Sequence, residues 1–232
     1  KADNTKKYAL PASITAPYVG VYSDENAKKQ AEAAKANGNE VEVFNIATMT
    51  NRKGCMSCFG CKRDGNKGVC VHRDGLAPVL DAIRDADGLI IGTPNYLGEV
   101  SASFRAMYER LIFQYITYNR EAFSCNPRRI PVLMIMTSNA SEEMYHQMGY
   151  DQVLSRYRQT LDSFIGPTEV MVYGDTLQVQ DYSPFDWNMF DPEAKIARHE
   201  NVFPEVRKGA FEVGSRFAEG IGEGNKTSPD FF

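Results

Sequence analysis

A short apolar run, a polar turn and a helical pattern follow one another between residues 89 and 110, and this order constrains the fold. Leu89 to Ile91 predict a buried strand, because strands of a parallel sheet that is covered on both faces are continuously apolar. Apolar residues then recur at helical spacing over residues 100–111. Open α/β sheets bind ligands beyond the carboxyl ends of their strands. The turn between the two elements is therefore a predicted ligand site, made of Thr93, Pro94, Asn95, Tyr96, Leu97 and Gly98.

The rest of the chain repeats the alternation of strand and helix. Periodicity predicts further strands at residues 18–22, 40–46, 131–136 and 169–173, and helices at residues 27–37, 76–86, 151–164 and 204–220. This order favours a parallel sheet with helices on both faces. We expect residues 1–17 to be an extended lead-in, residues 18–174 to form the main domain, and residues 175–232 to be a long irregular extension with a final helix, packed on that domain.

The composition is that of a globular protein and excludes several classes of function. A chain of 232 residues with 43% hydrophobic and 24% charged residues fits one domain. The net charge of -4 gives no general attraction to nucleic acid, and no apolar run is long enough to span a membrane. We expect a cytoplasmic protein; the alternative is an exported one whose signal was removed before Lys1.

Four of the five cysteines lie within sixteen residues, in the order Cys-x2-Cys-x2-Cys-x8-Cys. A two-residue spacer lets consecutive sulfurs converge on one centre, so this spacing favours metal or cluster ligands over disulfides. A cluster, a zinc ion and a set of free thiols stay open as alternatives. The candidate ligands are Cys55, Cys58, Cys61 and Cys70.

Two of these motifs resemble known families. The stretch Thr-Pro-Asn-Tyr-Leu-Gly-Glu-Val-Ser-Ala at residues 93–102 resembles the flavin loop of the flavodoxin-like NAD(P)H-dependent FMN reductases, Ser-Pro-x-Tyr-x-Gly-x-x-Ser-Ala. The cysteine run resembles that of the iron-sulfur flavoproteins, which share the fold and carry a 4Fe-4S cluster. The resemblance implies a flavodoxin-like three-layer sandwich with a five-stranded parallel sheet and FMN at its carboxyl edge.

The resemblance also implies roles for two further turns. In the family the first turn holds the flavin phosphate, and here Ser23 and Asn26 match its ends, although Asp24 and Glu25 carry the wrong charge for a phosphate. The turn after the strand at residues 131–136 contacts the isoalloxazine edge in the family. That role falls here on Thr137, Ser138 and Asn139.

The implied function is an FMN-dependent oxidoreductase that takes electrons from NAD(P)H as co-substrate to a quinone, a flavin or another small-molecule acceptor. With a 4Fe-4S cluster the electron donor would be ferredoxin. No catalytic side chain is expected, because the cofactor carries the chemistry. The aromatic segment after residue 175 suggests a homodimer or higher oligomer. Two alternatives stay open: an electron carrier without turnover of its own, and a metal-binding protein that has lost flavin.

Overall fold

The computed structural model describes residues 7–11 and 40–220 of the chain. Its strands form one six-stranded sheet, in which β2, β1, β3, β5 and β6 run parallel in that order and β4 pairs antiparallel with β3. This is the strand order of the flavodoxin-like doubly wound fold. The strands are β1 Lys7–Pro11, β2 Glu40–Phe44, β3 Gly88–Tyr96, β4 Glu99–Val100, β5 Val132–Thr137 and β6 Thr168–Tyr173.

The antiparallel β4 makes the sheet mixed, which corrects the purely parallel sheet predicted from the sequence. Leu97 and Gly98 have φ angles of 56° and 82°, and their turn lets Tyr96 pair with Glu99. Two consecutive residues at positive φ give the tight turn that joins hairpin strands. Four of the six residues predicted to form a polar turn, 93–96, therefore continue strand β3, and only Leu97 and Gly98 form the turn of a β-hairpin.

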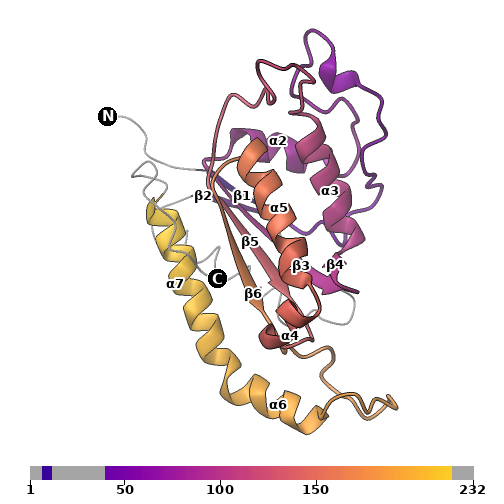
Figure 1. The fold of residues 1–232 in the computed structure, drawn as a ribbon, viewed down its shortest axis with the longest axis vertical. Coiled ribbons are helices and arrows are strands. Elements are labelled where there is room, and N and C mark those ends of the chain that lie inside the picture. The colour runs from indigo at the N-terminus through magenta and orange to yellow at the C-terminus, as the bar shows by residue number, and fades with distance from the viewer. Residues whose placement is uncertain (1–6, 12–39, 221–232) are drawn as a thin grey trace.

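Helices cover both faces of the sheet (Figure 1). Leu89 and Ile91 point into a core shared with α2, α3 and α5, whereas Ile90 points into a second core shared with α7. This alternation along one strand gives the three layers predicted from the sequence. The helices are α2 Ala77–Asp85, α3 Ala102–Phe113, α4 Glu142–Gln147, α5 Tyr150–Phe164, α6 Pro192–Asn201 and α7 Phe203–Gly220, with a short 3-10 helix η1 at Gly60–Lys62.

The start of the sheet differs from the prediction. Strand β1 lies within residues 1–17, which were expected to be an extended lead-in, and it pairs with both β2 and β3. The five residues of β1 begin with Lys7 and end with Pro11, and a proline disfavours assignment as a central strand. The strand predicted at residues 18–22 and the helix at 27–37 lie outside the described residues.

Most of the other predicted elements among the described residues begin and end within one residue of their predicted bounds, namely α2, β5, α5, β6 and α7. Helix α6 was not predicted, although the Asp191 carboxylate accepts hydrogen bonds from the backbone of Glu193 and Ala194 and a proline follows it, both ordinary signs of a helix start. No helix among the described residues is long and apolar enough to cross a membrane.

Candidate flavin site and cysteine pocket

The polar side chains of the β3 hairpin hold the hairpin itself in shape. The Thr93 hydroxyl accepts a hydrogen bond from the Ser101 backbone at 3.0 Å, and the Asn95 side-chain oxygen accepts one from the Gly98 backbone at 2.8 Å. Ser101 also caps α3 by accepting from the Phe104 backbone. These bonds fix the turn between β3 and α3.

The tip of this hairpin projects into solvent. Leu97 is fully exposed, in a left-handed conformation that is uncommon for leucine, and the Tyr96 side chain is also exposed. Burial of its ring face raises the pKa of Tyr96. An apolar side chain held out from a constrained turn is suited to lie against a ligand.

The second predicted turn lies beside the first at the carboxyl edge of the sheet. Pro94 of β3 is in register with Thr137 of β5, which is in register with Tyr173 of β6. Asn95 and Ser138 also lie on either side of Tyr145, whose hydroxyl is 3.5 Å from the Asn95 amide nitrogen. The predicted residues of the two turns, 93–98 and 137–139, therefore meet at one edge. Ser23 and Asn26 lie outside the described residues.

Two polar atoms at this edge are buried and have no hydrogen-bond partner among the described residues: Thr137 Oγ1 and Asn139 Oδ1. The Thr137 side chain is only 2% exposed. A buried polar atom without a partner costs about 1–3 kcal/mol, and a ligand that hydrogen-bonds to it removes that cost. A ligand with polar atoms along one edge could satisfy both positions.

The wall next to the second turn comes from the segment at residues 175–191, which has no helix or strand. The Thr176 backbone and hydroxyl both donate to the Ser138 carbonyl at 2.9 Å, and the Asp175 backbone donates to the Ala140 carbonyl at 2.9 Å. Lys195 of α6 donates to the Asn139 carbonyl at 2.9 Å and to the Asp175 carboxylate. Sequence reasoning missed Lys195, because a single lysine in a polar helix carries no signal of burial.

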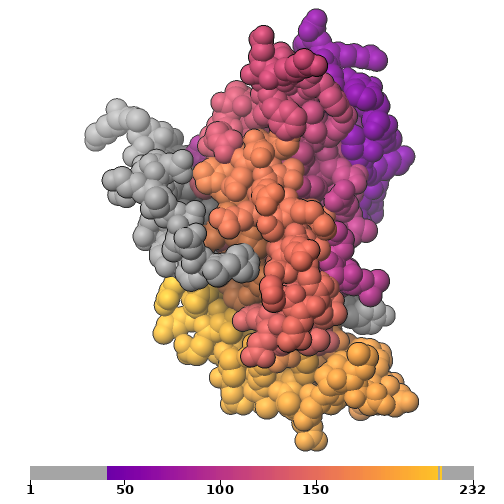
Figure 2. Space-filling model, viewed as in Figure 1, coloured from indigo at the N-terminus to yellow at the C-terminus, as the bar shows by residue number. Residues whose placement is uncertain are grey.

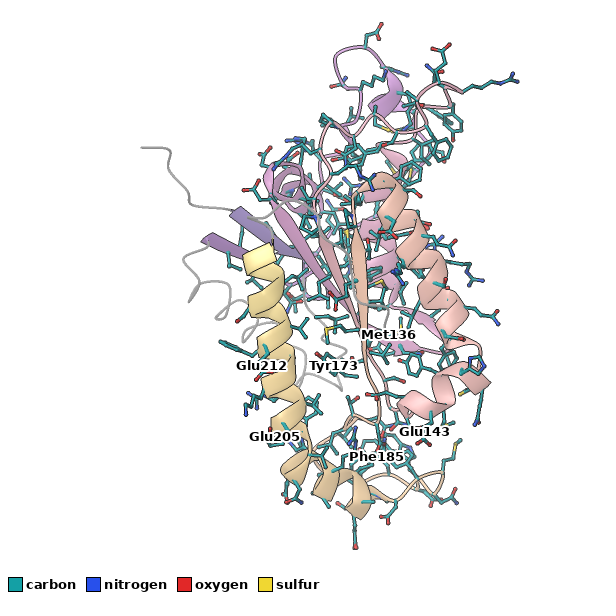
Figure 3. All side chains as sticks on the ribbon, turned by 60° about the vertical axis from the view of Figure 1, so that its left-hand side comes forward. Met136, Glu143, Tyr173, Phe185, Glu205 and Glu212 are labelled. Carbon is teal, nitrogen blue, oxygen red and sulfur yellow. The ribbon has the colours of Figure 1, made fainter. Side chains whose placement is uncertain are left out.

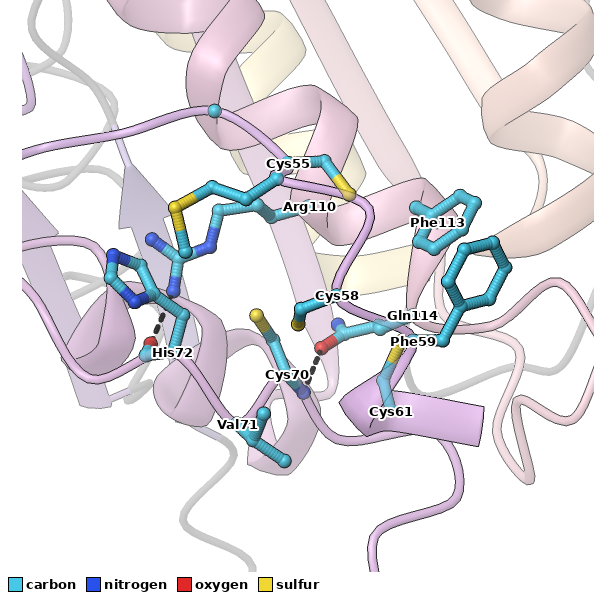
Figure 4. A pocket seen from close by; sticks show the side chains of 12 residues that line it. Cys55, Cys58, Phe59, Cys61, Cys70, Val71, His72, Arg110, Phe113 and Gln114 are labelled. Atoms are coloured by element: carbon cyan, nitrogen blue, oxygen red, sulfur yellow. Dashed lines mark hydrogen bonds between the residues drawn. The ribbon is translucent and has the colours of Figure 1, made fainter. Parts of the chain in front are cut away.

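The four cysteines line one pocket against the C-terminal half of α3 (Figure 4). The Cys70 backbone donates to the Gln114 side chain at 3.1 Å, and the Cys55 backbone donates to the Glu109 carboxylate at 3.3 Å. All four are free thiols, and burial raises the pKa of Cys61, against the opposing effect of Lys62. In the described ranges no three His, Cys, Asp or Glu side chains are placed to hold a metal. The predicted convergence of the sulfurs is therefore not seen.

A buried ion pair between Arg110 and Asp74 lies beside this pocket, and Arg110 is part of its lining. Arg110 and Asp74 have side chains 1% exposed, and Arg110 Nη1 lies 2.5 Å from Asp74 Oδ1. Arg110 also donates to the carbonyls of His72 at 2.6 Å and Lys53 at 3.4 Å. Burial opposes ionisation of Asp74, but hydrogen bonds from Arg110 and from the backbone of Lys53 and Leu76 outweigh it and lower its pKa. The arginine thereby ties both arms of the cysteine loop to α3.

The two candidate sites lie at opposite ends of α3. The hairpin of β3 and β4, the candidate flavin hairpin, joins its N-terminus, and the cysteine pocket contacts residues 109–114 near its C-terminus. Twelve helical residues span about 18 Å. In Figure 1 the cysteine loop lies accordingly at the end of the molecule away from α4 and α6.

Solved structures with this fold include several oxidoreductases. An NAD(P)H:quinone oxidoreductase from Methanothermobacter marburgensis matches with a TM-score of 0.63 and 13% identity, over 94% of this chain and 99% of that one. An azoreductase from Bacillus anthracis matches with a TM-score of 0.61 and 11% identity, over 91% and 99%. At such low identity the similarity establishes the flavodoxin-like fold and nothing further.

Curated relatives match over a shorter stretch. An iron-sulfur flavoprotein of Archaeoglobus fulgidus is 32% identical over 80 residues, which is 34% of this chain and 37% of the relative. One of Methanocaldococcus jannaschii is 30% identical over 83 residues, 36% of this chain and 41% of the relative. The match thus spans about two fifths of the length of these relatives.

The family model of the NADPH-dependent FMN reductases matches residues 19–164, more than half of the chain. This range contains the β3 hairpin, the turn after β5 and the cysteine loop. The match agrees with the strand order and with the two turns that meet at the carboxyl edge of the sheet. The chain therefore belongs to the NADPH-dependent FMN reductase family.

Proposed function

We propose that the protein is an FMN-dependent oxidoreductase that moves electrons from NAD(P)H to a small-molecule acceptor. The observation that carries this proposal is the pair of buried polar atoms, Thr137 Oγ1 and Asn139 Oδ1, which lie at the carboxyl edge of the sheet and have no partner within residues 7–11 and 40–220. Family membership supports it, as do neighbours in fold that are named as quinone and azo reductases. Bound FMN supplies a ring that accepts hydride from a nicotinamide and passes electrons on.

The chain's own residues bind and orient the ring. Thr137 and Asn139 offer a hydroxyl donor and an amide to the polar edge, and Tyr96 and Leu97 offer apolar contact from the hairpin tip. The Gly98 N–H is not available as a donor, because the Asn95 side chain already accepts from it. No acid, base or nucleophile of the protein is needed.

The test is an FMN titration followed by addition of NADPH without oxygen. Stoichiometric FMN binding and loss of the visible flavin absorption on adding NADPH or NADH are the expected results. Bound flavin that neither nucleotide bleaches would make the protein an electron carrier. No uptake of FMN at micromolar concentration would refute the proposal.

Thr137→Val should weaken FMN binding about 3- to 10-fold, since one hydrogen bond contributes roughly 0.5–1.5 kcal/mol. It should not lower the free energy of unfolding without FMN, because the lost hydroxyl has no partner among the described residues. Thr168→Val is the matched control: Thr168 is also buried, at the start of the neighbouring strand β6 and so at the opposite edge of the sheet from Thr137, and its hydroxyl donates to the Gly166 carbonyl at 2.9 Å. The control should lose about 1 kcal/mol of stability and keep its FMN affinity. If instead Thr137→Val lowered stability and kept its FMN affinity while Thr168→Val bound FMN more weakly, Thr137 would not belong to the flavin site.

We propose as a second function that the cysteine pocket carries an iron-sulfur cluster which exchanges electrons with ferredoxin. Two observations favour it: the four cysteines line one pocket, and the curated relatives are named iron-sulfur flavoproteins. Binding requires the loop at residues 54–70 to bring its sulfurs together; Cys58 is the exposed one of the four. Cysteine thiolates are the usual ligands of such clusters.

Cys58→Ser should reduce the iron of protein purified without oxygen from about four atoms per chain to under one. Its flavin content should stay unchanged, because the pocket and the flavin hairpin lie at opposite ends of α3. Iron and sulfide are assayed on the same sample. Cys125→Ser, which removes a cysteine outside the pocket, serves as the control. Wild-type protein with zinc or no metal would contradict the cluster and leave the flavin function in place.

A further inference from the structure

Strand β6 is an open edge of the sheet. It is the last strand in the order β2, β1, β3, β5 and β6, and no strand within the described part of the chain lies beyond it. Figure 3 shows it between α5 and α7, with Tyr173 at its carboxyl end. Edge strands are commonly protected by proline or lysine, because their free backbone groups can pair with another chain. The β6 sequence Thr-Glu-Val-Met-Val-Tyr contains neither residue.

The backbone groups of Val170 and Val172 point to this open side. Successive residues of a strand direct their N–H and C=O groups to opposite sides. The Pro167 and Tyr173 carbonyls accept hydrogen bonds from β5 at 2.8 and 3.0 Å, so the odd-numbered residues of β6 face β5. The Thr168 N–H, on the other side, donates to a carboxylate of α5 at 2.6 Å. Val170 and Val172 therefore offer their N–H and C=O groups to a further strand.

A groove of about 720 Å³ lies between this strand and α5. Its lining is apolar at Leu154 and Val170 and polar elsewhere, at His146, Asp151, Gln152, Ser155 and Arg158. In the space-filling view α5 lies on the surface of the molecule (Figure 2). The groove is therefore open to side chains that accompany a strand added to β6.

Two charged side chains of this groove have unused capacity for hydrogen bonds. One carboxylate oxygen of Asp151, Oδ2, lies 2.9 Å from His146 Nδ1, but Oδ1 is buried and has no partner within residues 7–11 and 40–220. Arg158 makes no hydrogen bond or ion pair with any described residue. Asp151, Ser155 and Arg158 recur at i, i+4 and i+7, so they form one stripe of α5. The stripe is negative at one end and positive at the other, about 10 Å away along the helix.

The strand and the stripe are complementary to themselves under a two-fold rotation, as a symmetric dimer requires. A rotation about Met171 pairs β6 with a second β6 in antiparallel direction and sets Val170 opposite Val172 of the other copy, so that each such pair exchanges two hydrogen bonds. The two α5 helices then run antiparallel on the same face of the joined sheet. The middle of the stripe lines the same groove as Val170, so Asp151 of each copy comes opposite Arg158 of the other.

We propose that a second copy of this chain occupies the edge of β6, and that the two copies join through β6 and α5 into one continuous sheet. Each Arg158 then meets the unpartnered oxygen of an Asp151. The proposal does not depend on a flavin, a cluster or an acceptor, and it leaves the carboxyl ends of β3 and β5 free. It places the dimer contact elsewhere than the sequence did, which indicated the aromatic segment after residue 175.

The test is the oligomeric state of the full chain, measured by sedimentation equilibrium. Wild type should have the mass of two chains at tens of micromolar. Arg158→Asp and Asp151→Lys should each raise the dimer dissociation constant at least about ten-fold, because each sets like charges opposite one another in both contacts. An equimolar mixture of the two variants should form dimers again, since every carboxylate of the stripe then meets a cation. This recovery separates the loss of a contact from misfolding.

Arg156→Asp is the matched control, because it makes the same change of charge at an exposed arginine of α5 outside the groove and should dimerise as wild type does. Trp187→Ser, in the aromatic segment, should also dimerise. Amide hydrogen exchange gives a second measurement: the N–H groups of Val170 and Val172 should exchange slowly in wild type and fast in Arg158→Asp. A monomeric wild type, a dimer that Arg158→Asp leaves intact, or a mixture that does not recover would overturn the proposal.

Discussion

Arg110→Met should lower the free energy of unfolding by about 3–5 kcal/mol, the cost of breaking a buried ion pair on one side. The variant leaves the Asp74 carboxylate, 1% exposed, without its cation. It also leaves the carbonyls of His72 and Lys53 without their donor. Methionine replaces much of the volume of the arginine stem, so lost packing contributes little. The measurement is urea unfolding of wild type and variant without FMN.

Arg73→Met is the matched control for this variant. Arg73 makes two hydrogen bonds to Asp81, at 3.0 and 2.8 Å, but its side chain is 58% exposed. An exposed pair of this kind contributes about 0.2–1 kcal/mol. Arg110→Lys should fall between the two, because lysine keeps the charge but lacks the planar fork that reaches several acceptors at once. Equal losses of unfolding free energy in Arg110→Met and Arg73→Met would contradict the conclusion that burial makes the Arg110–Asp74 pair the more important one.

The loss in Arg110→Met should also depend on pH. The folded wild type lowers the pKa of Asp74, so its contribution to stability is present above the ordinary carboxyl pKa and is lost as pH falls through the folded value. In the variant, burial without the cation raises that pKa, and protonation then stabilises the folded form. The difference in the free energy of unfolding between wild type and Arg110→Met should be largest near pH 7 and should become small below about pH 4. A difference that is constant with pH would point to packing instead of charge.

Arg110 illustrates what the sequence does not reveal. It stands in a helix between Glu109 and Leu111, where a charged residue is ordinarily on the surface, and its burial depends on two loop arms that arrive from residues 53 and 72–74. The same holds for Lys195, whose partners come from the turn after β5 and from Asp175. Contacts between segments far apart in the chain leave no periodic signal.

The elements that were predicted correctly are those with local signals. The apolar run of β3 and the helical spacing of α3 predicted both elements. The turn after β5 was found because polar residues follow a buried strand. Strand β1 was missed because five residues flanked by a lysine and ended by a proline show too little periodic pattern. In the structure, pairing with both β2 and β3 stabilises the strand despite this weak local signal.

The hairpin turn at residues 97–98 was also not predicted from the sequence, and it gives Gly98 a structural role. A leucine at positive φ is uncommon, so the sequence carried no signal for a two-residue hairpin turn here. Gly98 belongs to the stretch that resembles the flavin loop of the family. In the structure, a Cβ on Gly98 would lie 2.7 Å from the Tyr150 ring, and the φ angle of 82° disfavours any other residue. The glycine therefore serves the packing of the hairpin on α5.

Gly98→Val should weaken FMN binding more than ten-fold, about 1.4 kcal/mol or more. The added methyl groups press on Tyr150, which packs edge-on to Tyr145 at 5.4 Å, and the Tyr145 hydroxyl lies 3.5 Å from the Asn95 amide. Displacement of the Tyr150 ring should therefore shift Tyr145 and Asn95, and with them the turn that carries Tyr96 and Leu97. Left-handed strain adds about 1–2 kcal/mol to the cost of holding the native hairpin.

Gly65→Val separates strain from the clash, because Gly65 has a nearly identical φ of 84° and a Cβ there would meet nothing within 4 Å. It should lose a similar 1–2 kcal/mol of stability from strain and keep its FMN affinity. Adding Tyr150→Ala to Gly98→Val should recover part of the lost affinity, since the ring that obstructs the valine is gone. FMN titration of these variants gives the dissociation constants. Unchanged affinity in Gly98→Val would mean that the hairpin lies outside the flavin site, and Thr137 and Asn139 would then have to hold the ring without it.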